Sequence, residues 1–395
     1  METLAKNIAL KKLADLINKN RKEILNANKD DIRLCENIDI SLMDRLKIDD
    51  KKIDSMIDSI DKVWTMNDPE NKVLYEYRHD NGMIVKNKSV PFGKILIIYE
   101  SRPDVTIEAS ILAFKAGNEV LLKGGKEAHK SNEILVRLWQ EALKFAGLSG
   151  EEVRYLSVSR EEIQNIIKNN TLGIDMIIPR GGQGLINFVK NNSTVPIIVS
   201  GRGNNFAFID KDADFRIATS IIINGKSRIS VCNALDKVLI DKNSDNLNEK
   251  IKNLVDKLIK NNIEILGCND ICKIDSRVKL ASCSDVLDEE FLSARIYLSL
   301  VDNIDKAISI INNHSGGHSA TIISTDVKNA EKFQDNVDCA AVYHNVSTRF
   351  TDGGQFGFGA EIAISTQKLH FRGPIGLNQL VTNKWYIYGN GQIRE

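Results

Sequence analysis

The residue with the most direct chemical potential is Cys232, in the segment SRISVCNALD at positions 227–236. Lys226 and Arg228 precede it in a polar stretch between two apolar runs. Cations beside a thiol lower its pKa and raise the fraction of thiolate, which is the form that attacks electrophiles. Unpaired cysteines are also common as small, inert core side chains. These residue types leave two interpretations open, a nucleophile and a buried structural cysteine.

Two glycine-rich turns could perform a second kind of chemistry. Lys123-Gly124-Gly125-Lys126 joins the apolar run NEVLL to a helical pattern, and Arg180-Gly181-Gly182 joins DMIIP to another. Bare amides and cations at a helix N-terminus suit phosphate groups. Either turn alone could simply shape the chain. Two successive strand-end turns of this kind favour a nucleotide-binding sheet.

Alternating elements must position these residues. From about Gly93, and again after Asn224, short apolar runs alternate with helical patterns, which is typical of parallel sheets covered by helices. A chain of 395 residues favours two domains. An amphipathic helix opens the chain, and Asp80-Asn81-Gly82 marks a hairpin turn. We predict an α/β fold of two domains with open, mainly parallel sheets, plus a small hairpin at about 72–90 that could join another subunit.

Charge and cysteine usage narrow the class of partner. The chain carries 53 Lys+Arg and 53 Asp+Glu, so no global field attracts nucleic acid or an anionic membrane. No apolar run approaches a membrane span and the first 20 residues do not read as a signal peptide, which favours the cytoplasm. The spacing of the six cysteines fits neither a disulfide framework nor a zinc site, although Cys268 and Cys272 form C-x3-C. We expect a small-molecule substrate and no metal.

Several longer segments carry a resemblance. They are GKILIIYESRPDVTIEAS, NEVLLKGGKEAHKSN, PRGGQGLI, SVCNALDKVLI, STRFTDGGQFGFGAEIAISTQKLHFRGPIGL and GNGQIRE. Together they resemble the γ-glutamyl phosphate reductases, a family of the aldehyde dehydrogenase superfamily, from LINKNRKEILNANKDDI to the C-terminus. The resemblance implies an aldehyde dehydrogenase-like fold.

The resemblance also implies a reaction. It is the NADPH-dependent reduction of L-glutamate 5-phosphate to L-glutamate 5-semialdehyde and phosphate, the second step of proline biosynthesis from glutamate. Cys232 is then the nucleophile that forms a thioester, and its backbone amide, with Asn233 or Ser101, supplies hydrogen-bond donors to the oxyanion. The expected domains are 1–223 for NADP binding and 224–365 for catalysis. Residues 366–395 return to the hairpin of a homo-oligomer, a dimer or tetramer.

Further site residues follow from the same resemblance. Lys126 stands where many NAD-using relatives carry a glutamate that repels a 2'-phosphate, so NADPH is favoured over NADH. Glu290 matches the glutamate that contacts the nicotinamide ribose. Arg102 and Arg349 are the candidates for binding the substrate's anionic groups. The segment between Pro196 and Ile209 contains no carboxylate to activate water, which predicts a thioester protected from hydrolysis.

Four positions depart from the family pattern. Ser200 and Phe206 stand where histidines are expected, Ala320 replaces an acidic residue, and Gln355 replaces a glutamate. We expect these positions in segments on the substrate side. Two alternatives therefore stay open: a divergent paralogue that reduces another acyl phosphate or acyl thioester with the same cysteine chemistry, and a catalytically idle scaffold that binds nucleotide.

Overall fold

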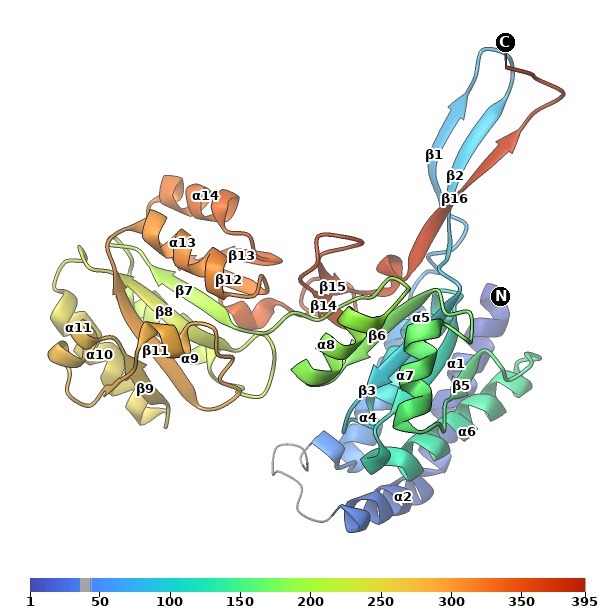
Figure 1. Cartoon of the computed structure of the whole chain (residues 1–395), viewed down its shortest axis with the longest axis horizontal. Helices are drawn as coiled ribbons and strands as arrows, with labels where there is room; N and C mark the ends of the chain where they lie inside the picture. Colours follow the sequence, from blue (N-terminus) through green and yellow to red (C-terminus); the bar gives the residue numbers. More distant parts are fainter. Residues whose placement is uncertain (36–42, 44, 395) are drawn as a thin grey trace. The chain divides into compact units, whose positions relative to one another are not determined.

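The computed structural model describes residues 1–35, 43 and 45–394, and the chain folds into two compact units (Figure 1). The first unit comprises Met1–Val199, Gly357–Ala363 and Ile375–Glu395, and the second comprises Ser200–Phe356 and Ile364–Pro374. Each unit contains one parallel sheet with helices on both faces. The predicted α/β class with two mainly parallel sheets is confirmed.

The boundary between the units differs from the predicted one at 223/224. Strand β7 (Asn205–Ile209) pairs in parallel with β8 (Leu235–Asp241) and β12 (Ser319–Ile323), so β7 belongs to the second sheet. Helix α9 (Phe215–Gly225) packs in the core of the same unit. An apolar run predicts a strand, but only its hydrogen-bond partners determine which sheet it joins.

The sheet of the first unit has four strands in the order β5-β4-β3-β6, and all its pairs are parallel. The strands are β3 (Lys94–Tyr99), β4 (Glu119–Gly124), β5 (Val153–Tyr155) and β6 (Met176–Arg180). Alternate residues of β3 enter different cores: Ile95 and Ile97 on one face, Leu96 and Ile98 on the other. This alternation is the strand period of two, with both faces apolar because both are covered.

Helices cover both faces of that sheet. One face carries α1 (Thr3–Lys19), α2 (Arg21–Leu34), α4 (Asp50–Thr65), α5 (Val105–Lys115) and α6 (His129–Phe145), and the other carries α7 (Arg160–Asn169) and α8 (Gln183–Asn192). A short 3-10 turn, η1 (Lys126–Ala128), connects β4 to α6. The strand ends and helix starts therefore meet at the carboxyl edge of the sheet, where ligands of such folds bind.

A separate antiparallel sheet contains the predicted hairpin. Strands β1 (Val73–Arg78) and β2 (Ile84–Pro91) are joined by a turn in which Gly82 has φ +85°, and β16 (Val381–Tyr388) pairs with the other edge of β2. Every residue of β1 is exposed. The last residues of the chain thus join the hairpin, as the resemblance implies.

The second unit is built on a seven-stranded sheet in the order β10-β9-β11-β8-β7-β12-β13. Its remaining strands are β9 (Glu264–Gly267), β10 (Lys279–Leu280), β11 (Arg295–Val301) and β13 (Ala341–His344). Helices α10 (Leu247–Lys260) and α11 (Asn269–Ile274) pack with α9 on one face, and α13 (Ile304–His314) and α14 (Val327–Asn336) on the other. The short elements of this unit are α12 (Cys283–Val286) and η2 (Thr348–Phe350). Strands β14 (Ala363–Ser365) and β15 (Gly373–Ile375) form a separate two-stranded sheet, and η3 (Leu377–Gln379) belongs to the first unit.

Within the described ranges 1–35, 43 and 45–394, no helix has both the length and the apolar content to cross a lipid bilayer. In the same part of the chain, no three His, Cys, Asp or Glu side chains gather to hold a metal ion.

Candidate functional site

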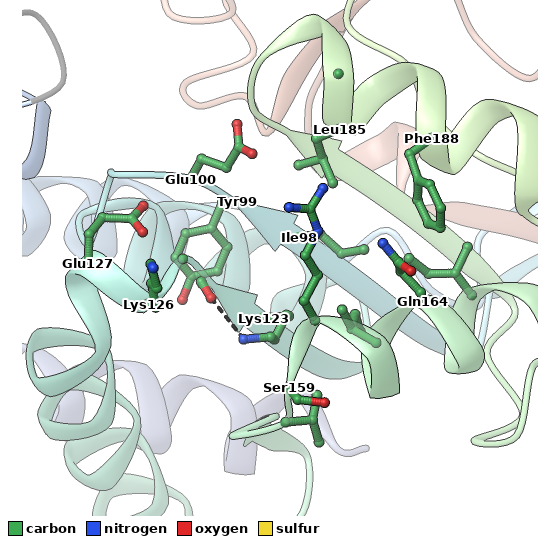
Figure 2. Close-up of a pocket in the computed structure, with 17 residues that line it drawn as sticks. Ile98, Tyr99, Glu100, Lys123, Lys126, Glu127, Ser159, Gln164, Leu185 and Phe188 are labelled. Atoms are coloured by element: carbon green, nitrogen blue, oxygen red, sulfur yellow. Dashed lines mark hydrogen bonds between the residues drawn. The ribbon is translucent and has the colours of Figure 1, made fainter. Parts of the chain in front are cut away.

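A cavity of about 690 Å³ lies at the carboxyl edge of the first unit's sheet (Figure 2). It is lined by the ends of β3 and β4 and by residues of α7 and α8. Its polar lining consists of three cations, two carboxylates, a hydroxyl and an amide, from Lys123, Lys126, Arg160, Glu100, Glu127, Ser159 and Gln164. Its wall is largely apolar, with Leu185 and Phe188 on one side. The volume and composition suit an organic cofactor.

The first glycine-rich turn borders this cavity as predicted, because Lys123, Gly124, Gly125 and Lys126 all line it. The Lys123 ammonium donates to the Gly124 carbonyl at 3.2 Å. Burial lowers the pKa of Lys123, while the carboxylate of Glu127 acts in the opposite direction. A side chain at Gly125 would place its Cβ about 2.5 Å from the Glu127 carboxyl carbon, so the Glu127 carboxylate, which accepts from Ser101, would have to move. The turn presents cations and backbone amides with little side-chain bulk.

The second glycine-rich turn lies beside the cavity and does not line it. Arg180 ends β6, and the Gly182 amide donates to Glu100 Oε2 at 2.7 Å. A Cβ at Gly181 would lie 2.8 Å from the Glu100 carboxyl carbon. The helix that follows contributes Gly184, Leu185 and Phe188 instead. The Gly182 amide, which the sequence suggested as a phosphate donor, therefore already donates to the Glu100 carboxylate.

A third strand-end turn contributes residues that the sequence reasoning missed. Ser159, Arg160 and Gln164 line the cavity from the start of α7. Ser159 caps this helix: its hydroxyl accepts from the Glu162 amide at 3.1 Å, and Glu162 Oε2 accepts from the Ser159 amide at 2.7 Å. The Ser-x-x-Glu pattern of this capping box is visible in the sequence and would have located the helix start.

Ser101 and Arg102 follow β3 in the first unit, and both are engaged there. The Ser101 amide and hydroxyl donate to Glu127 Oε1 at 2.7 and 2.8 Å. Ser101 has φ 49°, in the left-handed region. The Arg102 guanidinium lies 3.2 Å from Asp104 Oδ2 and 3.9 Å from Glu108 Oε2. A role for either side chain toward a substrate requires these contacts to change.

Cys232 lies in the second unit, in the irregular segment between α9 and β8, and is partly buried. Its backbone is fixed from the start of β7. The Asn205 amide nitrogen Nδ2 donates to the carbonyls of Cys232 and Ala234, each at 2.7 Å. The Cα of Gly203 packs so closely on Cys232 that a Cβ there would lie 2.5 Å from the Cys232 Cα. The position of Cys232 therefore depends on glycine at 203.

Asn233 connects the cysteine segment to η2. Its Nδ2 donates to the carbonyls of Arg349 and Thr351 at 3.1 and 3.0 Å, and its Oδ1 accepts from the Arg349 guanidinium. The Thr348 hydroxyl donates to the Asn233 carbonyl at 2.9 Å. Asn233 is thus occupied in holding Arg349 next to Cys232, and both its Nδ2 hydrogens already have acceptors.

The charges around Cys232 differ from those that the sequence suggests. Burial lowers the pKa of Arg349, the charge of Arg228 adds to this effect, and Cys232 and Asp352 oppose it. Arg349 is therefore close enough to Cys232 and to Arg228 for electrostatic interaction with each of them. Lys226 does not serve the thiol as expected, because its ammonium is buried in an ion pair with Asp236. Because the Asp236 carboxylate neutralises the Lys226 ammonium, Lys226 adds little stabilisation to a thiolate at Cys232.

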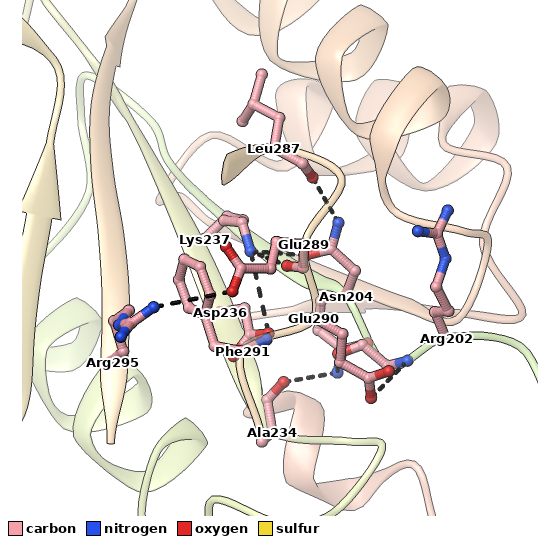
Figure 3. Close-up of polar contacts among 12 residues, drawn as sticks. Arg202, Asn204, Ala234, Asp236, Lys237, Leu287, Glu289, Glu290, Phe291 and Arg295 are labelled. Atoms are coloured by element: carbon pink, nitrogen blue, oxygen red, sulfur yellow. Dashed lines mark hydrogen bonds and ion pairs between the residues drawn. The ribbon is translucent and has the colours of Figure 1, made fainter. Parts of the chain in front are cut away.

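Figure 3 shows Glu290 and Lys237, a buried lysine, in the polar network around Asn204. The Glu290 carboxylate accepts from the Gly203 amide at 3.0 Å, and burial raises the pKa of Glu290. Lys237 is fully buried and donates to Asn204 Oδ1 at 2.9 Å and to the Glu289 carbonyl at 2.6 Å. Burial lowers the pKa of Lys237 to about 8, while Asp236 opposes this shift. A carboxylate thus reaches the 196–209 segment from a distant part of the chain, although none occurs within it.

Two of the four departures from the family pattern lie opposite each other in the core. Phe206 of β7 and Ala320 of β12 are register partners, and both are fully buried among apolar side chains. Ser200 forms an isolated bridge with Ser365. Gln355 is exposed, and its backbone N–H donates to Asp352 Oδ1 at 3.2 Å. The side chains of Phe206 and Ala320 themselves fill the second unit's core, and the expectation that these segments lie on the substrate side stays a prediction.

Comparison with known proteins places this geometry in a family. The model of the aldehyde dehydrogenase family matches residues 5–264 and 278–361. A γ-glutamyl phosphate reductase from Clostridium botulinum (strain Alaska E43 / Type E3) is 43% identical over 395 residues, which cover 99% of this chain and 95% of the relative. The chain belongs to the γ-glutamyl phosphate reductases. It is therefore an oxidoreductase that acts on an aldehyde-type substrate and uses a nicotinamide cofactor.

Solved structures agree with this family assignment. The crystal structure of γ-glutamyl phosphate reductase from Thermotoga maritima matches with a TM-score of 0.95 at 41% identity, covering 100% of this chain and 95% of that one. An acetylating aldehyde dehydrogenase from Geobacillus thermoglucosidasius matches with a TM-score of 0.70 at 16% identity, covering 100% and 94%. An engineered glycolyl-CoA reductase, solved with bound NADP+, matches at 0.68 and 17%, covering 98% and 92%. The last two likenesses show the aldehyde dehydrogenase-like fold.

Proposed function

We propose that this chain reduces L-glutamate 5-phosphate to L-glutamate 5-semialdehyde and phosphate with NADPH, through a thioester on Cys232. The observation that carries the proposal is the Cys232 segment, in which a partly buried thiol interacts electrostatically with the Arg349 guanidinium. The matching names of full-length relatives support the choice of substrate. The first unit is then the cofactor-binding domain, and the second carries the nucleophile.

Cys232 performs the covalent steps. Its thiolate attacks the acyl carbon, the C–S bond forms, and the C–O bond to the phosphoryl group breaks with release of phosphate. The reduced adduct collapses by breaking the same C–S bond, which regenerates the thiolate and frees the aldehyde. Sulfur suits both steps, because a thiolate is a good nucleophile and a good leaving group. A guanidinium beside a thiol stabilises the thiolate form, and this is the proposed role of Arg349 toward Cys232.

The first unit's cavity holds the nicotinamide cofactor, which supplies hydride when bound. Its donor set fits a dinucleotide: Lys123 and Lys126 face the cavity beside bare glycine amides, and a Cβ on Gly184 would meet no atom within 4 Å. Lys126 binds the 2'-phosphate and makes NADPH the preferred form. Arg160 lies on the same cavity wall and adds a second cation. Glu290 is proposed to hold the nicotinamide ribose.

The substrate's anionic groups are assigned to arginines. Arg349 is partly buried beside Cys232 and Asn233, so it is proposed to bind the phosphoryl or carboxylate group. Arg102 is the proposed second anchor. The Cys232 amide supplies the oxyanion donor, with Ser101 or Asn233 contributing only if they leave their present acceptors.

Assembly through the three-stranded antiparallel sheet is also proposed. The outward side chains of β1 and β16 include exposed Tyr75, Tyr77, Trp385 and Ile387. Both strands are edges of their sheet, with backbone groups available for pairing. A homodimer or homotetramer would cover these aromatic side chains. The cytoplasmic location stays a prediction.

The reverse reaction tests the proposed function most directly. Purified protein is assayed for NADPH formation from L-glutamate 5-semialdehyde and NADP, with and without inorganic phosphate. We expect turnover only with phosphate, because phosphate must cleave the thioester. Glutamate formation without phosphate would eliminate the acyl-phosphate mechanism, and phosphate-dependent turnover of a different aldehyde alone would support the paralogue.

A further inference from the structure

In the irregular segment 287–291, which we call the strap, every residue makes at least one hydrogen bond to the rest of the second unit. It lies between α12 and β11 and belongs to no sheet ladder. The Leu287 carbonyl accepts from Asn204 Nδ2 at 2.6 Å, and the Asp288 carbonyl accepts from Arg202 at 2.9 Å. The Phe291 amide donates to Asp236 Oδ2 at 2.8 Å.

Lys237, on β8, connects the strap to Asn204, which precedes β7. Its ammonium donates to the Glu289 carbonyl in the strap and to Asn204 Oδ1 outside it. The same ammonium lies 3.7 Å from the centre of the Phe291 ring and 4.0 Å from Asp236 Oδ2 (Figure 3). Lys237 therefore contacts the strap by a hydrogen bond and by a cation–π interaction, and it is fully buried.

The strap acts on the cysteine through two further contacts. Glu290 accepts from the Gly203 amide, and the Gly203 Cα packs on the Cys232 backbone with no room for a side chain. Asn205 Nδ2 bonds the carbonyls of Gly203 and Cys232 at 3.0 and 2.7 Å, which joins the two segments. A shift of the strap would therefore be transmitted to Gly203 and from there to Cys232.

We propose that Lys237 is a positioning residue for the Cys232 thiol, acting through the strap and Gly203. This inference rests on the proposed role of Cys232 as nucleophile. Without the ammonium, the Glu289 carbonyl and Asn204 Oδ1 both lose a buried partner, and the strap keeps only the bond from the Phe291 amide to Asp236 of its two hydrogen bonds to β8. Small displacements of a reacting group are enough to reduce the rate greatly.

The test uses Lys237→Met, with Lys115→Met as its matched control. Lys115 is also buried, at 1% exposure, but it bonds Asp68 and Asn7 in the first unit. Both variants remove a buried ammonium and keep most of the side-chain volume. For each, we would measure the melting temperature, kcat and KM, and the rate at which iodoacetamide alkylates Cys232, followed by mass spectrometry of its peptide.

We expect Lys237→Met to lower kcat by about 30-fold, to change KM little, and to slow Cys232 alkylation by roughly 5-fold relative to Lys115→Met. Equal kcat and equal alkylation rates in the two variants would overturn the proposal. If the wild type does not turn over L-glutamate 5-phosphate but Lys237→Met still slows Cys232 alkylation, the positioning role of Lys237 is supported and only the proposed substrate is refuted.

A second variant covers the case in which Lys237→Met does not fold. Arg202 is exposed and donates to the strap at Asp288, so Arg202→Ala should fold normally. We expect a fall in kcat of roughly 3-fold and slower Cys232 alkylation without a lower melting temperature. If both rates match those of the wild type, the strap does not position the thiol.

Discussion

The carboxyl edge of the first unit's sheet and the Cys232 segment of the second unit differ in how their polar groups are used. At the first edge, Lys123, Lys126 and Arg160 face an open cavity, and a Cβ on Gly184 would meet no atom within 4 Å. Around Cys232, the Asn205 and Asn233 side-chain amides and the Gly203 amide are all engaged in internal hydrogen bonds. The first region turns three cations toward an open cavity, whereas the second uses its polar groups to fix one side chain.

This difference explains which kind of substitution each region tolerates. A binding edge loses affinity in proportion to the contacts removed, because each cation acts largely on the ligand. A reactive segment loses rate when its geometry changes, even if no group that touches the substrate is altered. The predictions below separate the two behaviours, and they run from the largest expected effect to the smallest.

The largest effect is expected at the thiol itself. Cys232→Ser should lower turnover by roughly 10³-fold or more, because a serine alkoxide is scarcely populated near neutral pH. Steady-state assays would measure the loss of kcat, and a separate titration should show that cofactor binding is unchanged. Cys283→Ser is the control, since Cys283 is exposed and a serine can keep its hydrogen bond to the Tyr297 hydroxyl. Near-normal turnover by Cys232→Ser would remove Cys232 from the mechanism.

The next effect concerns geometry without any change of chemical group. Gly203→Ala places a methyl group against the Cys232 backbone, which must shift, so kcat should fall by roughly 100-fold. Gly267→Ala is the matched control, because its Cβ would lie 2.6 Å from Val278 Cγ1 in the same unit. It should cost stability with little change in kcat. Equal kcat values for the two variants would mean that the Cys232 segment is not geometrically constrained.

A smaller effect is expected at the binding edge. Lys126→Glu should shift the ratio of kcat/KM for NADPH over NADH toward NADH by about 10- to 100-fold, which corresponds to one charge-assisted contact. Lys130→Glu is the control, because Lys130 pairs with Asp30 on the surface. An unchanged ratio in Lys126→Glu, or equal use of both cofactors by the wild type, would contradict the assignment of Lys126.

The smallest effect is on stability. His318 is fully buried, and burial lowers its pKa from 6.5 to about 4. Between pH 6.5 and 4, His318 is protonated in the unfolded chain and neutral in the folded chain. As the pH is lowered through this range, the free energy of unfolding therefore falls by about 1.4 kcal/mol per pH unit. Urea unfolding at several pH values should show a weaker dependence in His318→Asn than in His79→Asn, which lies on the exposed hairpin. Equal dependences would show that His318 stays accessible to protons.

Local sequence predicted the binding edge better than the reactive segment. The Lys-Gly-Gly-Lys turn forms a strand end and a helix start in one continuous stretch, so its position at the cavity follows from the order of elements. The surroundings of Cys232 come from Gly203, Glu290 and Arg349, which are distant in sequence. Sequence proximity misidentified Lys226 as a partner of the thiol, since the side chain turns to Asp236. The domain boundary was missed for a similar reason, because strand pairing is not local.

The buried partners Phe206 and Ala320 have a consequence for how substitutions at either position should be interpreted. They are register partners on neighbouring strands and belong to one apolar core cluster. A histidine at 206 alone would enclose an imidazole without a carboxylate, and an acidic residue at 320 alone would enclose a charge without a partner. We expect each single substitution to cost more stability than the two together. The two sites should therefore behave as an epistatic pair, in which a substitution at one is interpreted only in the background of the other.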